Sequence, residues 1–142
     1  MQDMTPAEIT AFLMDTMRTG KVATVRADGR PHLAPIWYIY EEGKLYFNTW
    51  HESVKGQNIT RDGRISICVD EEQPPFAFVI IEGSAEVVPV TPAERLTWST
   101  RLARRYMGDD LAEQYGQRNG VEGELLICVT PDKIIAKKNV SN

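Results

Sequence analysis

The strongest constraint on the fold lies in residues 21–40, KVATVRADGRPHLAPIWYIY, where apolar and polar side chains alternate on both sides of Asp28-Gly29. An Asp-Gly pair between two alternating runs predicts a β-hairpin. Further runs that resemble strands follow as LYFNTW, RISICVDEE, FAFVIIEGSAEVVPV and GELLICVTPDKIIAKK. Gly83 inside the longest run is expected to mark a bulge or bend. About six strands with hairpin spacing predict an antiparallel barrel or a strongly coiled sheet.

Two helices are predicted by the tetrapeptide TPAE, which occurs at residues 5–8 and again at 91–94. Thr at the N-cap, Pro at the first helical position and Glu three residues after the Thr together form a capping box. The first helix is expected to stop near Gly20 and to carry an apolar stripe of Ile9, Phe12, Leu13 and Met17. The second carries Leu96, Leu102, Ala103 and Tyr106. Residues 109–120 are expected to form a short helix or a turn.

Composition restricts the class of protein. At 142 residues, the chain is expected to form one domain, residues 1–142. A net charge of −4 and the acidic pairs Glu41-Glu42 and Glu71-Glu72 argue against nucleic acid as a partner. No apolar run approaches the length of a membrane span, and the start has no pattern of a secretory signal, so a cytoplasmic location is expected. Cys68 and Cys128 are expected to be reduced core residues, and no cluster predicts a metal site.

Residues 48–58, NTWHESVKGQN, carry more chemistry than a connection needs. Ser53 is placed as an N-cap, and Lys55 falls in the first helical turn, where the helix dipole disfavours a cation. A bound phosphate would remove that conflict, because helix starts bind anions. Asn58 and Arg61 lie about one turn further on and could orient the lysine. The alternative is a solvated loop with a surface lysine, and the residues alone favour neither.

The order of these segments resembles the split β-barrel flavin- and deazaflavin-binding proteins related to pyridoxamine 5′-phosphate oxidase. The matching segments are KVATVRADGRPHLAPIWYIY, GKLYFNTWHESVKGQNITRDGRISICVD and FAFVIIEGSAEVV. The segment ARRYMGDDLAEQYGQRNGVEGELLICVTPDKI is similar to the branch that depends on the deazaflavin coenzyme F-420. The resemblance runs from about Thr5 to Lys138. It implies a mainly β fold with flanking helices, a split antiparallel barrel of the FMN-binding type.

The resemblance also implies which residues bind the cofactor. Ser53 and Lys55, with Gln57 or Asn58 nearby, would hold the phosphate, although many relatives have a second basic residue in place of Ser53. The ring would lie along the second strand, on Ala34, Pro35, Ile36 and Trp37. The alternative for Trp37 is a place in the barrel core. Asn48, Thr49 and Trp50 would line the route between ring and phosphate. Such proteins are homodimers with the cofactor at the subunit boundary, so Phe76 and Phe78 would reach across from the partner.

The implied activity is hydride transfer from reduced coenzyme F-420 to an unsaturated or electron-poor organic substrate, without catalytic acids or bases in the protein. An FMN-dependent oxidase or reductase is the alternative, and a non-catalytic cofactor or tetrapyrrole carrier is another. The anionic tail of coenzyme F-420 would need further cations, for which the candidates are Lys21, Arg26, Arg30, Arg61, Lys137 and Lys138. Arg101, Arg104 and Arg105 either bind that tail or form a solvated face. Substrate specificity is expected in residues 70–76, residues 106–122 and the partner.

Overall fold

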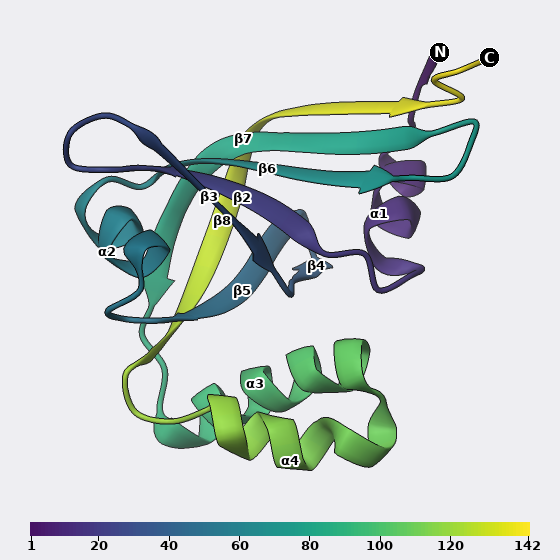
Figure 1. The fold of residues 1–142 in the computed structure, drawn as a ribbon. Helices are drawn as coiled ribbons and strands as arrows, with labels where there is room; N and C mark the ends of the chain where they lie inside the picture. The colour runs from purple at the N-terminus through teal and green to yellow at the C-terminus, as the bar shows by residue number, and fades with distance from the viewer.

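The computed structural model describes residues 1–142 and shows a curled sheet flanked by four helices (Figure 1). The strands are β1 (Gln2–Asp3), β2 (Gly20–Val25), β3 (Pro31–Ile36), β4 (Ile39–Glu41), β5 (Lys44–Trp50), β6 (Arg64–Glu71), β7 (Ala77–Val88) and β8 (Glu124–Lys138). The helices are α1 (Pro6–Met14), α2 (Val54–Arg61), α3 (Pro92–Met107) and α4 (Asp109–Asn119).

The sheet is antiparallel throughout and follows the order β3-β2-β6-β7-β8-β5-β4. The path ends at β3 on one side and at β4 on the other, and no ladder joins these two strands. Only Trp37 and Tyr38 connect them along the chain. The sheet therefore curls into a barrel that stays split between β3 and β4, which confirms the predicted split β-barrel.

The predicted hairpin and bulge are both confirmed. β2 and β3 pair from Gly20 opposite Ile36 to Val25 opposite Pro31, and the turn between them contains Gly29 at a positive φ of 88°. The β7–β8 ladder shifts register between Glu82 and Gly83. A Cβ at Gly83 would collide with the backbone of β8, so this position needs glycine. The Asp28-Gly29 pair and Gly83 therefore mark the turn and the bulge that the sequence predicts.

The strand count and the end of the first helix differ from expectation. The sheet has eight strands instead of about six, because β1 and β4 are only two and three residues long. α1 ends at Met14, well before Gly20, and Met17 is 63% exposed. Arg18 donates to the carbonyl of Phe12 at 2.6 Å and to Asp15 at 3.0 Å. These bonds satisfy the end of the helix while the chain turns toward β2.

The barrel interior forms one apolar core of 18 buried side chains, drawn from the sheet together with Phe12, Leu13 and Ile59 of the helices. Both capping boxes are formed, by Thr5 with Glu8 and by Thr91 with Glu94. α3 and α4 form an antiparallel hairpin that lies below the barrel in Figure 1. No helix is long and apolar enough to cross a membrane. The barrel and this helical hairpin together define the site described next.

Candidate functional site

A cleft of about 510 Å³ opens where the barrel meets the helical hairpin. Elements far apart in sequence form it: the end of β3, the middle of β5, the start of α2, the end of α4 and the start of β8. Its lining residues are Thr19, Pro35, Ile36, Trp37, Asn48, Lys55, Arg118, Asn119 and Glu124. Five of these were candidates from the sequence. Thr19, Arg118, Asn119 and Glu124 were not.

The apolar wall of the cleft lies at the split in the barrel. It is formed by Pro35 and Ile36 at the end of β3 and by Trp37, the residue that follows them. The Trp37 ring lies parallel to the ring of Tyr106 on α3, with centroids 5.2 Å apart and an interplanar angle of 3°. Tyr106 is held in turn by its hydroxyl, which donates to the carbonyl of Arg18 at 2.8 Å. Trp37 therefore stacks on the helical hairpin outside the barrel core, and the alternative of a core tryptophan does not apply.

The start of α2 has the local geometry that the sequence predicts. Ser53 is the N-cap, and its Oγ accepts a hydrogen bond from the Gly56 N–H at 3.1 Å. The Ser53 and Thr49 hydroxyls also share a hydrogen bond of 2.8 Å. Thr49 is buried. These two hydroxyls are therefore engaged in holding α2 to the end of β5, and neither residue belongs to the lining of the cleft.

Lys55 extends from the first turn of α2 into the cleft, where its side chain is half-buried. No carboxylate lies within 4.0 Å of its ammonium, and no hydrogen bond to Nζ is formed, whereas Lys21, Lys137 and Lys138 all have acidic partners. Burial lowers the pKa of Lys55, and the nearby negative charge of Glu124 partly opposes that shift. A half-buried ammonium without an internal partner is suited to an anionic ligand.

Glu124 faces Lys55 across the same cleft from the first position of β8. Burial raises the pKa of Glu124, and the positive charge of Lys55 partly lowers it again. The Glu124 carboxylate has no hydrogen-bond or ion-pair partner within the chain. The polar end of the cleft thus holds an unpaired cation and an unpaired acid, both half-buried.

Asn58 lies outside the cleft. It is buried, its Nδ2 donates to Thr24 Oγ1 at 3.0 Å, and its Oδ1 accepts from Arg61 at 3.3 Å. Arg61 also donates to the carbonyl of Val25. The pair thus fastens α2 to the β2–β3 hairpin. His32 on β3 is half-buried, and burial, followed by the charges of Arg26 and Lys55, lowers its pKa.

The remaining candidates are spread around the barrel. Trp50 pairs with Glu124 in the sheet, is 42% exposed, and covers Gly123, where a Cβ would come within 2.6 Å of the ring, but it does not line the cleft. Ala34 is half-buried in β3, opposite Val22. Phe76 and Phe78 lie where β6 turns into β7, beside the C-terminus (Figure 1). Within one chain, these two rings do not join the cleft.

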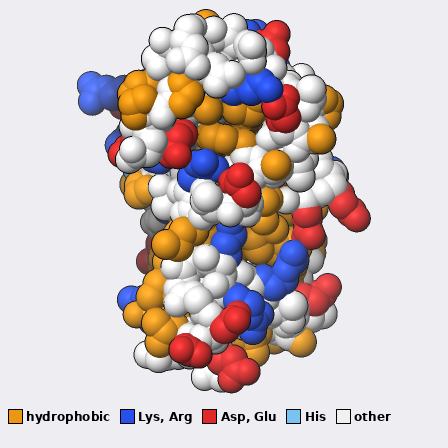
Figure 2. Space-filling view, turned by 90° about the vertical axis from the view of Figure 1, so that its right-hand side faces the viewer, with side chains coloured by type: hydrophobic (Ala, Val, Ile, Leu, Met, Phe, Trp, Pro, Cys, Tyr) orange, Lys and Arg blue, Asp and Glu red, His pale blue; other side chains and the backbone are white.

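Two arginines of α3 attach the helical hairpin to the barrel. Arg101 makes two hydrogen bonds to Glu41, at 3.0 and 3.1 Å, and Arg105 donates to the carbonyls of Leu13, Thr16 and Tyr38. Figure 2 shows Lys and Arg side chains gathered on one face where the barrel meets the hairpin. Arg104 pairs with Asp109 on the surface. These residues are neither a free row of cations nor part of the cleft.

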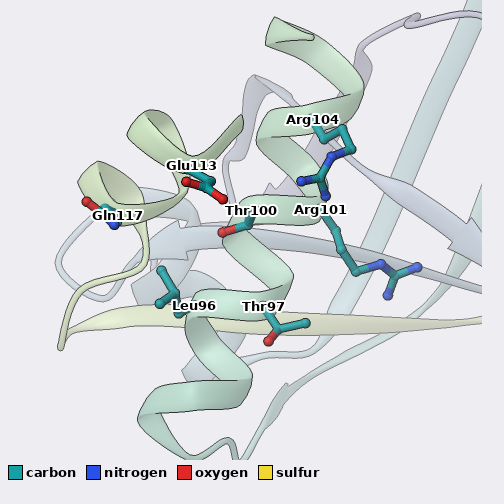
Figure 3. Close-up of a pocket in the computed structure, with 7 residues that line it drawn as sticks. All are labelled: Leu96, Thr97, Thr100, Arg101, Arg104, Glu113 and Gln117. Atoms are coloured by element: carbon teal, nitrogen blue, oxygen red, sulfur yellow. The ribbon is translucent and has the colours of Figure 1, made fainter. Parts of the chain in front are cut away.

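A second hollow, of about 430 Å³, lies between α3 and α4 (Figure 3). Glu113 and Gln117 project from α4 toward α3, and Arg101 points away from α4 toward its partner Glu41. Leu96 is its only apolar lining residue. This hollow offers no apolar wall for a planar ring, so the cleft at Trp37 and Lys55 is the better candidate for a cofactor.

Comparison with known proteins identifies the family of this chain. Residues 5–138 match the family model described as pyridoxamine 5′-phosphate oxidase. The 5a,11a-dehydrotetracycline/5a,11a-dehydrooxytetracycline reductase of Streptomyces rimosus is 26% identical over 129 residues, which cover 83% of this chain and 85% of that protein.

Two solved structures illustrate the likeness in fold. A conserved hypothetical protein of Mycobacterium tuberculosis superposes with a TM-score of 0.82 at 26% identity, covering 97% of this chain and 87% of that one. A protein described as an F-420 reductase has a TM-score of 0.67 at 22% identity, covering 87% of this chain and 94% of that one. With the split barrel and the nearly full-length family match, the chain belongs to the pyridoxamine 5′-phosphate oxidase family of oxidoreductases.

Proposed function

We propose that this protein is a reductase that uses the deazaflavin coenzyme F-420 to transfer a hydride to an unsaturated or electron-poor organic substrate. The observation that carries the proposal is the unpaired ammonium of Lys55 in one cleft with the apolar wall at residues 35–37. An anion site beside an apolar wall suits a cofactor that joins a planar ring to a phosphate. The chemistry of the lining residues therefore fits a flavin-type group.

Different residues of the cleft would bind different parts of the cofactor. Pro35, Ile36 and Trp37 would support the ring and keep water from one side of it. Lys55 would bind the phosphate, helped by the N-terminal end of α2. Arg118 at the end of α4 would bind the negative charge of the cofactor tail beyond the phosphate. From the sequence, other cations were the candidates for this role. The bound deazaflavin would supply the hydride chemistry itself.

The comparisons support a reductase of an organic substrate. The relative from Streptomyces rimosus is named for the reduction of dehydrotetracyclines, which are unsaturated organic molecules. The neighbour described as an F-420 reductase shares the fold. Together with the resemblance of residues 103–134 to the deazaflavin branch, these names favour coenzyme F-420 over FMN. We further propose a homodimer, in which Phe76 and Phe78 of one subunit complete the cleft of the other.

Titration of the purified protein with coenzyme F-420 and with FMN, followed by cofactor fluorescence, tests the proposal. Coenzyme F-420 is expected to bind, and Lys55→Ala is expected to weaken binding about 10- to 150-fold, the loss of one charged hydrogen bond. Lys44→Ala removes an exposed lysine at the start of β5 and serves as the matched control. Binding of FMN alone would favour the flavin enzyme. Binding without turnover would favour a carrier, and binding of neither cofactor would refute the proposal.

A further inference from the structure

The acid in the cleft is the feature that phosphate binding alone does not explain. Glu124 begins β8 and lies opposite Trp50 in the ladder, close to the start of α2. Its carboxylate faces the cleft together with the Lys55 ammonium, and neither group has a partner in the chain. A carboxylate beside a phosphate site repels the phosphate, so its presence reduces the affinity for anions.

The balance of charge in the lining is therefore small. Lys55 and Arg118 are cationic and Glu124 is anionic, and no other lining residue carries a charge. The hydroxyls of Ser53 and Thr49 add no donors to the lining, because they are hydrogen-bonded to each other and Ser53 also accepts from the N–H of Gly56. Two cations opposed by one acid leave about one positive charge for the ligand.

We propose that Glu124 is a specificity-determining residue that shifts the selectivity of the cleft away from a phosphomonoester dianion and toward a phosphodiester monoanion. The inference rests on the proposed function and deepens it, because the phosphate of coenzyme F-420 is a diester whereas that of FMN is a monoester. A phosphate monoester carries about −1.5 to −2 charges at pH 7, because its second pKa is about 6. A diester carries one negative charge. The acid thus penalises FMN more than it penalises the deazaflavin.

The size of the effect follows from the charge product. The Coulomb energy between Glu124 and a phosphate scales with the phosphate charge, so a dianion is repelled about twice as strongly as a monoanion at the same place. Neutralising Glu124 should therefore raise the affinity for both ligands, and the fold-gain for a monoester should be about the square of the fold-gain for a diester. A threefold gain for the diester corresponds to about a tenfold gain for the monoester.

A matched pair of ligands isolates this charge. FMN and its phosphate methyl ester share one ring and differ in phosphate charge, so we would titrate both at pH 8, by flavin fluorescence, into wild type and Glu124→Gln. The wild type is expected to prefer FMN over the methyl ester by a smaller ratio of affinities than Glu124→Gln does. Glu124→Gln is expected to raise FMN affinity about tenfold and methyl ester affinity about threefold.

Controls separate the inference from the proposed function. Glu122→Gln removes an exposed acid two residues away and should leave the ratio of the two affinities unchanged. Glu124→Ala repeats the test without an amide, with the melting temperature as a check on folding. Equal gains for the two flavin ligands, or no gain, would overturn the inference while leaving coenzyme F-420 binding intact. Failure of coenzyme F-420 to bind the wild type would instead overturn the proposed function.

Discussion

Replacing Arg105 with methionine is expected to detach the helical hairpin from the barrel. The Arg105 guanidinium lies 4.5 Å from the Tyr38 ring centroid and donates to three carbonyls outside its own helix. Those carbonyls belong to Leu13, Thr16 and Tyr38, at the end of α1 and at the split in the barrel. Methionine has similar length and can pack in the same space, but it donates no hydrogen bond.

The expected cost follows from the number of acceptors left without a partner. A hydrogen bond from a charged group contributes about 1.5–3 kcal/mol. The carbonyls of Leu13 and Tyr38 are reached by partly buried hydrogen bonds, whereas water can replace the donor at the exposed Thr16 carbonyl. Two lost bonds give a loss of about 3–6 kcal/mol in the free energy of unfolding. For a chain of this length, the melting temperature should fall by about 10–20 °C.

Thermal and urea unfolding followed by circular dichroism would measure the loss. Arg104→Met is the matched control, because the neighbouring Arg104 is paired only with Asp109 and both side chains are largely exposed. An exposed ion pair contributes about 0–1 kcal/mol, so this control should unfold nearly as the wild type does. If Arg105→Met lost less than about 1 kcal/mol, or no more than Arg104→Met, the attachment of the hairpin through Arg105 would be refuted.

Three further predictions concern the surroundings of the cleft. Gly123→Ala should lower the free energy of unfolding by about 1–3 kcal/mol in urea melts, because φ is 99° and the Cβ would lie 2.6 Å from the Trp50 ring. Gly116→Ala should cost about 1–3 kcal/mol and weaken cofactor binding in the fluorescence titration, since its Cβ would lie 2.9 Å from Thr100 Cα and push α4 away from α3. Burial raises the pKa of Glu124 above 4.5, so its contribution to stability is complete below pH 4.5 and is lost as pH rises through the folded-state pKa. Glu124→Gln should therefore reduce the fall in unfolding free energy between pH 4.5 and 7, and an unchanged pH profile would contradict this assignment.

The elements that could be predicted from the sequence are those whose signals are local. The hairpin at Asp28-Gly29, the two capping boxes, the Ser53 cap and the bulge at Gly83 all depend on a few adjacent residues. The strands β1 and β4 escaped prediction because two or three residues cannot show alternation. The early end of α1 depends on Arg18 reaching back to Phe12, a tertiary choice that helical periodicity does not encode.

The same contrast between local signals and tertiary packing holds for the candidate site. Lys55 was singled out by its place in the first turn of a helix and residues 35–37 by the family resemblance, and the fold brings them to one cleft. Glu124 stands 69 residues after Lys55, and only the antiparallel register of β5 with β8 brings it near. The packing of α4 on α3 brings Arg118 to the cleft. The six tail candidates were chosen by charge alone, and Lys21, Lys137 and Lys138 pair with acids elsewhere on the barrel.

The split between β3 and β4 gives the cleft a mechanical property that a closed barrel lacks. No ladder hydrogen bond crosses the split, so the barrel can widen there without losing any bond of the sheet. The backbone of Tyr38 finds its partners on α3 instead: its N–H donates to Tyr106 at 3.2 Å, and its carbonyl accepts from Arg105. Side chains of α3 thus supply the hydrogen-bond partners that a neighbouring strand would otherwise provide. Because Trp37 stacks on Tyr106 of that same helix, α3 fixes the position of the apolar wall of the cleft from outside the barrel.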